Sequence, residues 1–216
     1  MGKTRQLVRD FHKRSIVLSD REIDAAFGLG IATVEEKLDF LDLVLHYGQH
    51  RLYQGDMNYH VIRELYTRLE AFEKSSRFHI SHILDLGSGY GRLGLYGTML
   101  WQNVHFYGIE MVLERVLEAQ KASNILGLDS VEFVSGDAAQ APWPFTNCFI
   151  IMNSFFPEVL EKILSRLESL SKSQDFAIVS VWSSNDYIYQ QQWLQEAVIP
   201  GFLNEKLSIK IFQTFK

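Results

Sequence analysis

The sequence predicts an α/β protein built on a doubly wound, mostly parallel β-sheet. From residue 80 onward, short apolar runs alternate with segments of helical periodicity, which is typical of strands and crossover helices in such a sheet. The apolar run at 83–86 contains a carboxylate, Asp85, and is followed by glycines at alternate positions, Gly87, Gly89 and Gly91. A buried strand that turns sharply into a helix through glycines is typical of the first unit of a ligand-binding sheet.

The composition is that of an ordinary globular protein of one domain with a modest appendage. The chain has 216 residues, of which 47% are hydrophobic and 22% are charged. The net charge of −5 disfavours a protein that coats nucleic acid non-specifically. The single cysteine, Cys148, lies in an apolar run and cannot build a disulfide framework or a metal cluster. No signal peptide or bilayer-length run is present, so we expect a cytoplasmic protein without a metal, membrane or nucleic-acid partner.

Residues 1–56 are predicted to form an N-terminal helical cap, in front of a ligand-binding domain of residues 57–216. The first 14 residues carry five basic side chains against one acidic side chain, Asp10, and are expected to be a solvated basic end, with a substrate-binding or nucleic-acid arm as the alternative. Capping patterns and the spacing of apolar residues then predict three helices. These helices run from Ser19 to Gly28, from Thr33 to Gly48, and from Asp56 or Asn58 to Ser75.

The remainder of the chain is predicted to form six strands and four intervening helices. The strands are expected at 79–85, 104–109, 131–134, 149–152, 176–182 and 207–215. The helices are expected at 91–100, 113–126, 157–170 and 185–198, and Pro157 suits the first turn of the third.

Polar residues follow each of the first four predicted strands. They are Asp85, Glu110, Asp137 and Asn153. Because ligands of a doubly wound sheet bind where the carboxyl ends of the strands meet, we expect these side chains to share one site. Glu110 comes about twenty residues after the glycine turn, as expected for an acid that binds two ribose hydroxyls.

An adenosine placed across these strand ends would have its base near Met111, Asp137 and Ala138. Asp137 could accept a hydrogen bond from the base or act only as a turn residue. The glycines read G-x-G-x-G, whereas a dinucleotide site usually reads G-x-G-x-x-G. An acid at Asp85 would repel phosphate but can help to hold a cationic amino-acid group. This favours S-adenosyl-L-methionine as cofactor over NAD, although an NAD-dependent reductase or nucleotide-binding module, with Arg92 as the nearby cation, is a remote alternative.

Three segments resemble the first three motifs of the class I S-adenosylmethionine-dependent methyltransferases: 85–91 (DLGSGYG), 107–110 (YGIE) and 135–138 (SGDA). Together with the run NSFFPEV at 153–159, they are similar to the non-SET histone-lysine methyltransferase-like proteins. The resemblance implies a Rossmann-like, seven-stranded-type sheet that ends in a hairpin. Either residues 199–202 form the partner of the last predicted strand, or the sequence ends before the hairpin is complete.

The motifs and the resemblance together predict the residues of the site. The predicted cofactor-binding residues are Asp85, Gly87, Ser88, Gly89, Gly91, Glu110, Met111, Asp137, Ala138 and Asn153. The predicted catalytic residues are Asn153, near the methyl group, with Phe156 and Tyr53. Asn153 has the alternative role of a hydrogen-bonded polar group at a strand end.

The predicted function is N-methylation of a protein side chain, of the lysine type. A lysine must arrive neutral, which an apolar channel walled by Phe155, Phe156 and Tyr53 would favour by lowering the pKa of the amine. A small-molecule acceptor is the alternative, and the segment 47–59 distinguishes the two. An open groove lined by carboxylates favours a basic peptide, and a closed apolar pocket favours a metabolite.

Overall fold

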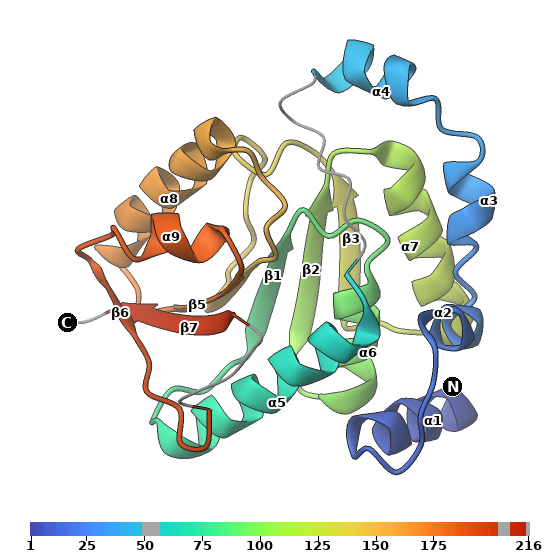
Figure 1. Ribbon diagram of the computed structural model, residues 1–216, viewed down its shortest axis with the longest axis horizontal. Coiled ribbons are helices and arrows are strands. Elements are labelled where there is room, and N and C mark those ends of the chain that lie inside the picture. Colours follow the sequence, from blue (N-terminus) through green and yellow to red (C-terminus); the bar gives the residue numbers. More distant parts are fainter. Residues whose placement is uncertain (49–56, 203–207, 215–216) are drawn as a thin grey trace.

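The computed structural model describes residues 1–48, 57–202 and 208–214, and Figure 1 shows a twisted sheet with helices on both faces. The first five strands in the chain pair in parallel, and the last strand pairs antiparallel with its two neighbours in the sheet. The strands are β1 (His82–Leu86), β2 (His105–Glu110), β3 (Val131–Ser135), β4 (Cys148–Ile151), β5 (Ala177–Val181), β6 (Leu194–Glu196) and β7 (Ile209–Thr214). Their order is β3-β2-β1-β4-β5-β7-β6, which confirms the predicted fold class.

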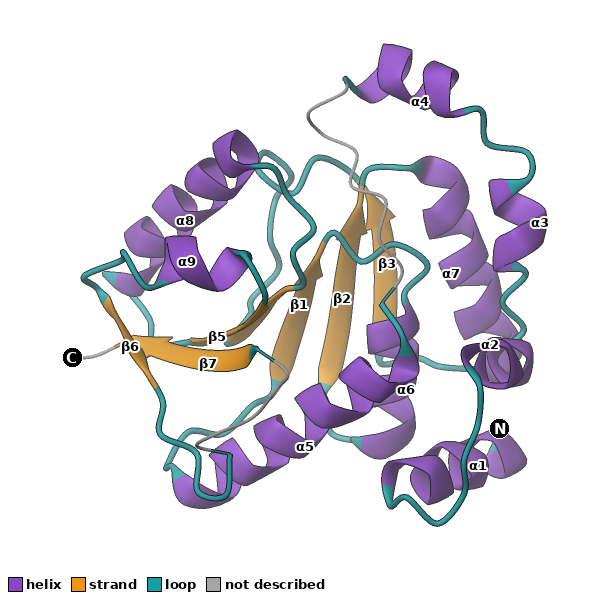
Figure 2. Ribbon diagram, viewed as in Figure 1, coloured by secondary structure: helices purple, strands orange, loops and turns teal. Residues whose placement is uncertain are grey.

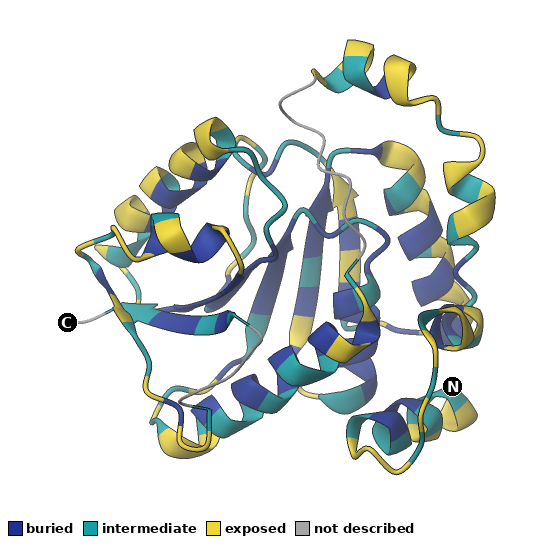
Figure 3. Ribbon diagram, in the orientation of Figure 1, coloured by how far each residue is buried: buried dark blue, intermediate teal, exposed yellow. Residues whose placement is uncertain are grey.

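The strand order reverses between β1 and β4. The chain moves outward from β1 to β2 and β3, and then returns to place β4 on the other side of β1. Crossover connections leave in opposite directions at this point, so a crevice forms at the carboxyl ends of the two strands. The central strands are buried, as Figure 3 shows.

Each face of the sheet carries its own apolar core. On one face, β1 contributes Ile83 and packs with α5 (Tyr59–Ser75), α6 (Arg92–Leu100) and α7 (Leu113–Leu126). On the other face, β1 contributes Leu84 and packs with α8 (Pro157–Ser171) and α9 (Ser184–Ile188), as seen in Figure 2. The predicted bounds of α7 and the predicted start of α8 at Pro157 are confirmed.

Four helices precede the sheet: α1 (Gly2–His12), α2 (Asp20–Phe27), α3 (Ile31–Glu35) and α4 (Phe40–Tyr47). The predicted capping box at Ser19 and Glu22 is present, and Asn58 caps α5 through Val61. None of the five basic side chains predicted to be solvated is buried, and Lys3, Lys13 and Arg14 are exposed, but the segment also forms a docked helix, because α1 buries Val8 and Phe11 completely in the core that contains α6. Apolar residues three positions apart give this basic helix one buried face.

The single helix predicted from Thr33 to Gly48 is replaced by α3 and α4. Thr33 lies inside α3, which begins at Ile31, so it caps nothing. Asp39 caps α4 instead, since its carboxylate accepts hydrogen bonds from the backbone N–H groups of Leu41 at 2.7 Å and Asp42 at 3.2 Å. A strong capping residue between two short apolar segments divides the helix.

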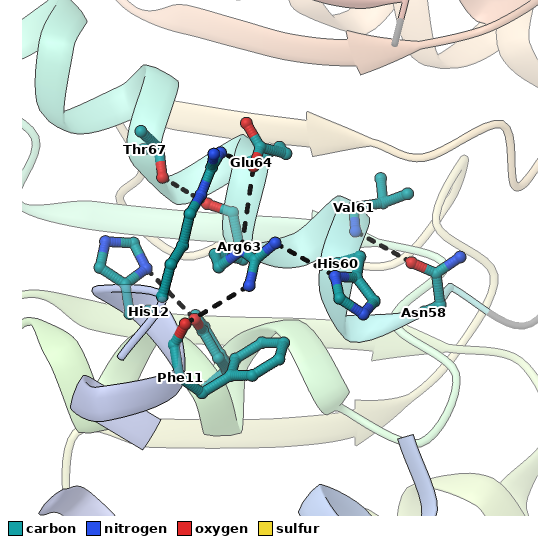
Figure 4. Close-up of polar contacts among 10 residues, drawn as sticks. Phe11, His12, Asn58, His60, Val61, Arg63, Glu64 and Thr67 are labelled. Atoms are coloured by element: carbon teal, nitrogen blue, oxygen red, sulfur yellow. Dashed lines mark hydrogen bonds and ion pairs between the residues drawn. The ribbon is translucent and has the colours of Figure 1, made fainter. Parts of the chain in front are cut away.

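Figure 4 shows how α1 is held on α5. Arg63 lies over the ring of Phe11, with 4.8 Å between its guanidinium carbon and the ring centroid, and donates to the Phe11 carbonyl at 3.5 Å. Arg63 also donates to Nδ1 of His60 at 3.1 Å. Arg14, which follows α1, pairs with Glu64 of α5. The first helix is therefore fixed by polar contacts at its end as well as by its apolar face.

The helix predicted at 185–198 is wrong. Only 184–188 is helical, in α9, and Leu194–Glu196 forms β6, which pairs antiparallel with β7. The hairpin is thus present, but its partner strand lies before the predicted residues 199–202. Pairing satisfies the N–H and C=O groups of β7 that would otherwise form a long open edge, and this non-local gain outweighs the local helical pattern.

Among the described helices, none is long and apolar enough to cross a membrane.

Candidate active site

A cavity of about 410 Å³ opens at the carboxyl ends of the strands. Residues from the loops after β1, β2, β3 and β4 line it, together with residues of the N-terminal region. Its volume lies within the range of small-molecule sites. Most predicted cofactor residues lie in its wall: Asp85, Gly87, Ser88, Gly89, Glu110, Met111, Asp137 and Ala138.

The loop after β1 requires glycine for two separate reasons. At Gly87, with φ of +80°, an added Cβ would lie 2.5 Å from the Cβ of Ser154. At Gly91, with φ of +71°, it would lie 2.4 Å from the ring of Phe133. Both positions combine left-handed backbone with close packing, which side chains do not tolerate. Gly91 does not line the cavity, and its position shows a packing role at the start of α6.

The Glu110 carboxylate is held in place by backbone donors on both sides. The N–H of Gly89 donates to one carboxylate oxygen at 2.9 Å, and the N–H of Val112 donates to the other at 2.9 Å. Each oxygen has a second lone pair, so the carboxylate can accept two further hydrogen bonds from a ligand. Glu110 therefore links the glycine loop to the end of β2 and presents a fixed pair of acceptors.

Asp85 is buried beside Glu110 with an unsatisfied oxygen. Its Oδ1 has no hydrogen-bond partner among the described residues, and the same is true of the buried Oγ of Ser88. Burial, followed by the negative charge of Glu110, raises the pKa of Asp85 to about 7. Unsatisfied buried polar atoms are uncommon and costly, so a cationic or hydrogen-bond-donating ligand would relieve this arrangement.

The Asp137 side chain shapes the loop after β3. Its carboxylate accepts hydrogen bonds from the N–H of Ala139 at 2.9 Å and from the side-chain amide of Gln140 at 2.8 Å. The carbonyl of Ala138 accepts from Trp143 and Arg166, each at 3.0 Å. The turn role of Asp137 is thus present, and Ala138 is fixed against the cavity.

Only some residues of the loop after β4 line the cavity. Ser154 and Phe155 line the cavity, whereas Asn153 and Phe156 are not among the lining residues. Asn153 has φ of +58°, and its side-chain oxygen accepts a hydrogen bond from the hydroxyl of Ser183. Phe156 is the N-cap residue of α8. Tyr53 lies outside the described residues.

Helix α3 contributes a wall residue that no sequence pattern indicates. A single carboxylate oxygen of Glu35 accepts from the hydroxyl of Tyr90 at 2.6 Å and from Nε of Arg115 at 3.0 Å, and all three residues line the cavity. Burial and this hydrogen bond raise the pKa of Tyr90. Only Tyr90 lies in a recognisable motif, and the sequence does not link Glu35 to it.

A buried ion pair joins α2 to the start of α6. Arg92 donates to both carboxylate oxygens of Asp24, at 2.9 and 2.5 Å, and to the carbonyl of Met57 at 3.2 Å. The hydroxyl of Tyr59 donates to Asp24 at 2.9 Å. Arg92, which the sequence offers as a cation near the glycines, is therefore bound by α2.

No group of three or more His, Cys, Asp or Glu side chains in the described part of the chain is placed to hold a metal ion.

The chain matches no protein-family model and no curated protein sequence. Its fold is similar to that of solved methyltransferases. An RNA methyltransferase from Salinibacter ruber, solved with S-adenosyl-L-homocysteine, has a TM-score of 0.51 at 19% identity, over 74% of this chain and 92% of that chain. A Staphylococcus aureus protein assigned to the caffeoyl-CoA O-methyltransferases has a TM-score of 0.55 at 11% identity, over 86% and 97%.

TrmN from Thermus thermophilus has a TM-score of 0.54 at 13% identity, over 75% of this chain and 50% of that chain. The chain thus has a Rossmann-like fold similar to that of these methyltransferases. The closer resemblance to histone-lysine methyltransferase-like proteins stays a prediction, since none of these three neighbours is described as one.

The buried pair between Asp24 and Arg92 predicts a large stability effect. Asp24→Asn removes the largely buried negative charge that accepts hydrogen bonds from both Arg92 and Tyr59, which should cost about 3–5 kcal/mol of unfolding free energy. Urea denaturation measures this loss. The matched control is Glu196→Gln, which breaks the half-exposed pair with Lys210 and should cost less than about 1 kcal/mol. Equal losses in the two variants would contradict the prediction.

The raised pKa of Asp85 predicts a pH-dependent stability. Its pKa rises from 3.8 to about 7 on folding, so the folded protein holds this proton more tightly than the unfolded chain. The corresponding stabilisation is complete below about pH 4 and is lost as the pH rises through about 7. Relative to Asp85→Asn, the wild type should lose on the order of 4 kcal/mol between about pH 4 and pH 8 in urea denaturation. Parallel stability curves for the two proteins would exclude this titration.

Proposed function

We propose that the protein is an S-adenosyl-L-methionine-dependent methyltransferase. The observation that carries the proposal is the buried carboxylate of Asp85, with its unsatisfied oxygen, beside the fixed carboxylate of Glu110 in one cavity. A ligand that combines a ribose with a cationic amino-acid group complements these two acids. The Salinibacter ruber neighbour, solved with S-adenosyl-L-homocysteine, adds support for this ligand class.

The residues present suit such a cofactor. Glu110 would accept hydrogen bonds from the ribose hydroxyls, and Met111 and Ala138 would flank the base. Asp85 would hold the cationic amino-acid end, while the backbone at Gly87 comes close without a side chain. Bound S-adenosylmethionine supplies a methyl group already activated on a sulfonium, so the chain chiefly has to position the acceptor and exclude water.

The charges around the cavity argue against a dinucleotide. Arg92 is paired with Asp24, and Arg115 is paired with Glu35. The carboxylates of Asp85 and Glu110 would repel a pyrophosphate. This arrangement supports a ligand without phosphates.

For the acceptor, we propose an amine of a protein side chain, of the lysine type. Met152, Phe155 and Val159 give the cavity an apolar wall, and such surroundings favour the neutral amine that attacks the methyl group. Residues 49–56, in the segment that distinguishes this acceptor from a small molecule, lie outside the described residues.

Thermal unfolding with S-adenosylhomocysteine and, separately, with NAD tests the proposed cofactor. At a hundred times its dissociation constant, a ligand adds about 2.7 kcal/mol to the folded state, which for this chain length raises the midpoint by about 5–10 °C. We expect that shift with S-adenosylhomocysteine, and its loss in Asp85→Asn. Asp129→Asn, an exposed aspartate at the other end of β3, should keep the shift. A shift with NAD alone would overturn the proposal.

A further inference from the structure

Helix α4 exposes apolar side chains that the described protein does not use. Leu45 is 83% exposed, Leu41 is 69% exposed and Phe40 is 47% exposed. No residue of α4 belongs to either of the two cores. Figure 3 shows the helix largely exposed, and Figure 1 shows it standing out beyond the carboxyl ends of β2 and β3. A cluster of exposed apolar residues of this kind marks an interaction site.

The position of α4 connects it to the cavity. The residue that ends α3, Glu35, lines the cavity wall, and α4 begins five residues later in the chain at Phe40. The chain returns to the same wall at Met57. In the chain, α4 thus lies between two residues of the cavity wall, and it stands beyond the carboxyl ends of β2 and β3, the side of the sheet on which the cavity opens.

The charged side chains around α4 are mainly acidic. Between residues 36 and 42 the chain carries three carboxylates, Glu36, Asp39 and Asp42, against the single ammonium group of Lys37. The carboxylates of the cavity continue this negative region inward. Such a surface attracts basic groups and repels phosphate, so it disfavours nucleic acid and anionic lipid.

The shape of the exposed surface points to a helix as partner. Leu41 and Leu45 are four residues apart and therefore form one ridge along α4. A ridge of this spacing packs into the groove of another helix. An amphipathic helix with one apolar face and flanking lysines would meet both the leucines and the carboxylates.

We propose that α4 is the docking surface for a basic amphipathic helix of the acceptor protein. This deepens the proposed function, on which it rests, because it names the partner and places a lysine-rich segment at the mouth of the cofactor cavity. Docking of two α4 surfaces against each other is disfavoured, since their carboxylates would repel.

Fluorescence anisotropy with two labelled peptides tests the docking surface on the full chain. The basic probe is LKKLLKLLKKLLKL, and the acidic probe has Glu at every Lys position. We expect the basic probe to bind and the acidic probe not to bind. Leu41→Gln/Leu45→Gln should weaken binding at least tenfold, and Glu36→Lys/Asp42→Lys should do the same. Asp39 is kept because it caps α4.

Two control variants make the same chemical changes elsewhere. Leu117→Gln/Ile125→Gln removes apolar side chains of α7 that are 53% and 65% exposed. Asp129→Lys/Glu132→Lys reverses two exposed charges at the amino end of β3. Both should bind the basic probe within about twofold of the wild type. Equal weakening in the controls, or equal binding of the acidic probe, would overturn the proposal.

Further measurements distinguish other partners of α4 from the proposed helix, and distinguish a failure of the docking surface from a failure of the proposed function. Sedimentation velocity that shows a dimer lost in Leu41→Gln/Leu45→Gln would assign α4 to a second copy of the chain and overturn the proposal. Binding to phosphatidylcholine vesicles lost in that variant would assign it to a lipid surface and also overturn it. The midpoint shift with S-adenosylhomocysteine reports the cofactor site independently. A normal shift with no probe binding overturns the docking surface alone, whereas no shift in the wild type overturns the methyltransferase on which the acceptor role rests.

Discussion

Asp85 lies buried at the carboxyl end of β1, beside Glu110, with one oxygen that no described residue satisfies. Burial, followed by the negative charge of Glu110, raises the pKa of Asp85, and the cost of burying this carboxylate must be offset by the surrounding fold and by a ligand. The sheet offsets part of this cost, because β1 is fixed between β2 and β4. The glycine loop leaves room for a ligand, since its glycines have no side chains and its backbone can reach the cavity. The cationic amino-acid group of the proposed cofactor would offset the remaining cost of burying this carboxylate.

The N-terminal helices complete the cavity rather than merely preceding the sheet. Asp24 in α2 binds Arg92 at the first turn of α6, and Glu35 in α3 binds Tyr90 of the glycine loop. These contacts fix the glycine loop from outside the sheet and neutralise the cations that could attract phosphate. The same helices lead to α4, whose exposed apolar ridge and carboxylates stand beyond the carboxyl ends of β2 and β3. The N-terminal helices thus connect the cavity of the proposed cofactor with the proposed docking surface of the acceptor.

The sequence predicts the parts of this structure that depend on local patterns. Parallel strands align their carboxyl ends, so the placement of Asp85, Glu110 and Asp137 in one cavity follows from their positions after apolar runs. The pairing of Leu194–Glu196 with β7 does not follow, because it depends on contacts distant in sequence. The left-handed backbone at Asn153, which accompanies its hydrogen bond with Ser183, also leaves no pattern in the sequence. Glu35 was missed for a related reason, as its partners lie far along the chain.

The most direct test of the central claim is a crystal structure of the protein grown with S-adenosylhomocysteine. We expect the ligand in the cavity, with its ribose hydroxyls on Glu110 and its ammonium group within hydrogen-bond distance of Asp85. Density for the ligand elsewhere, or in this cavity with the amino-acid end directed away from Asp85, would contradict it.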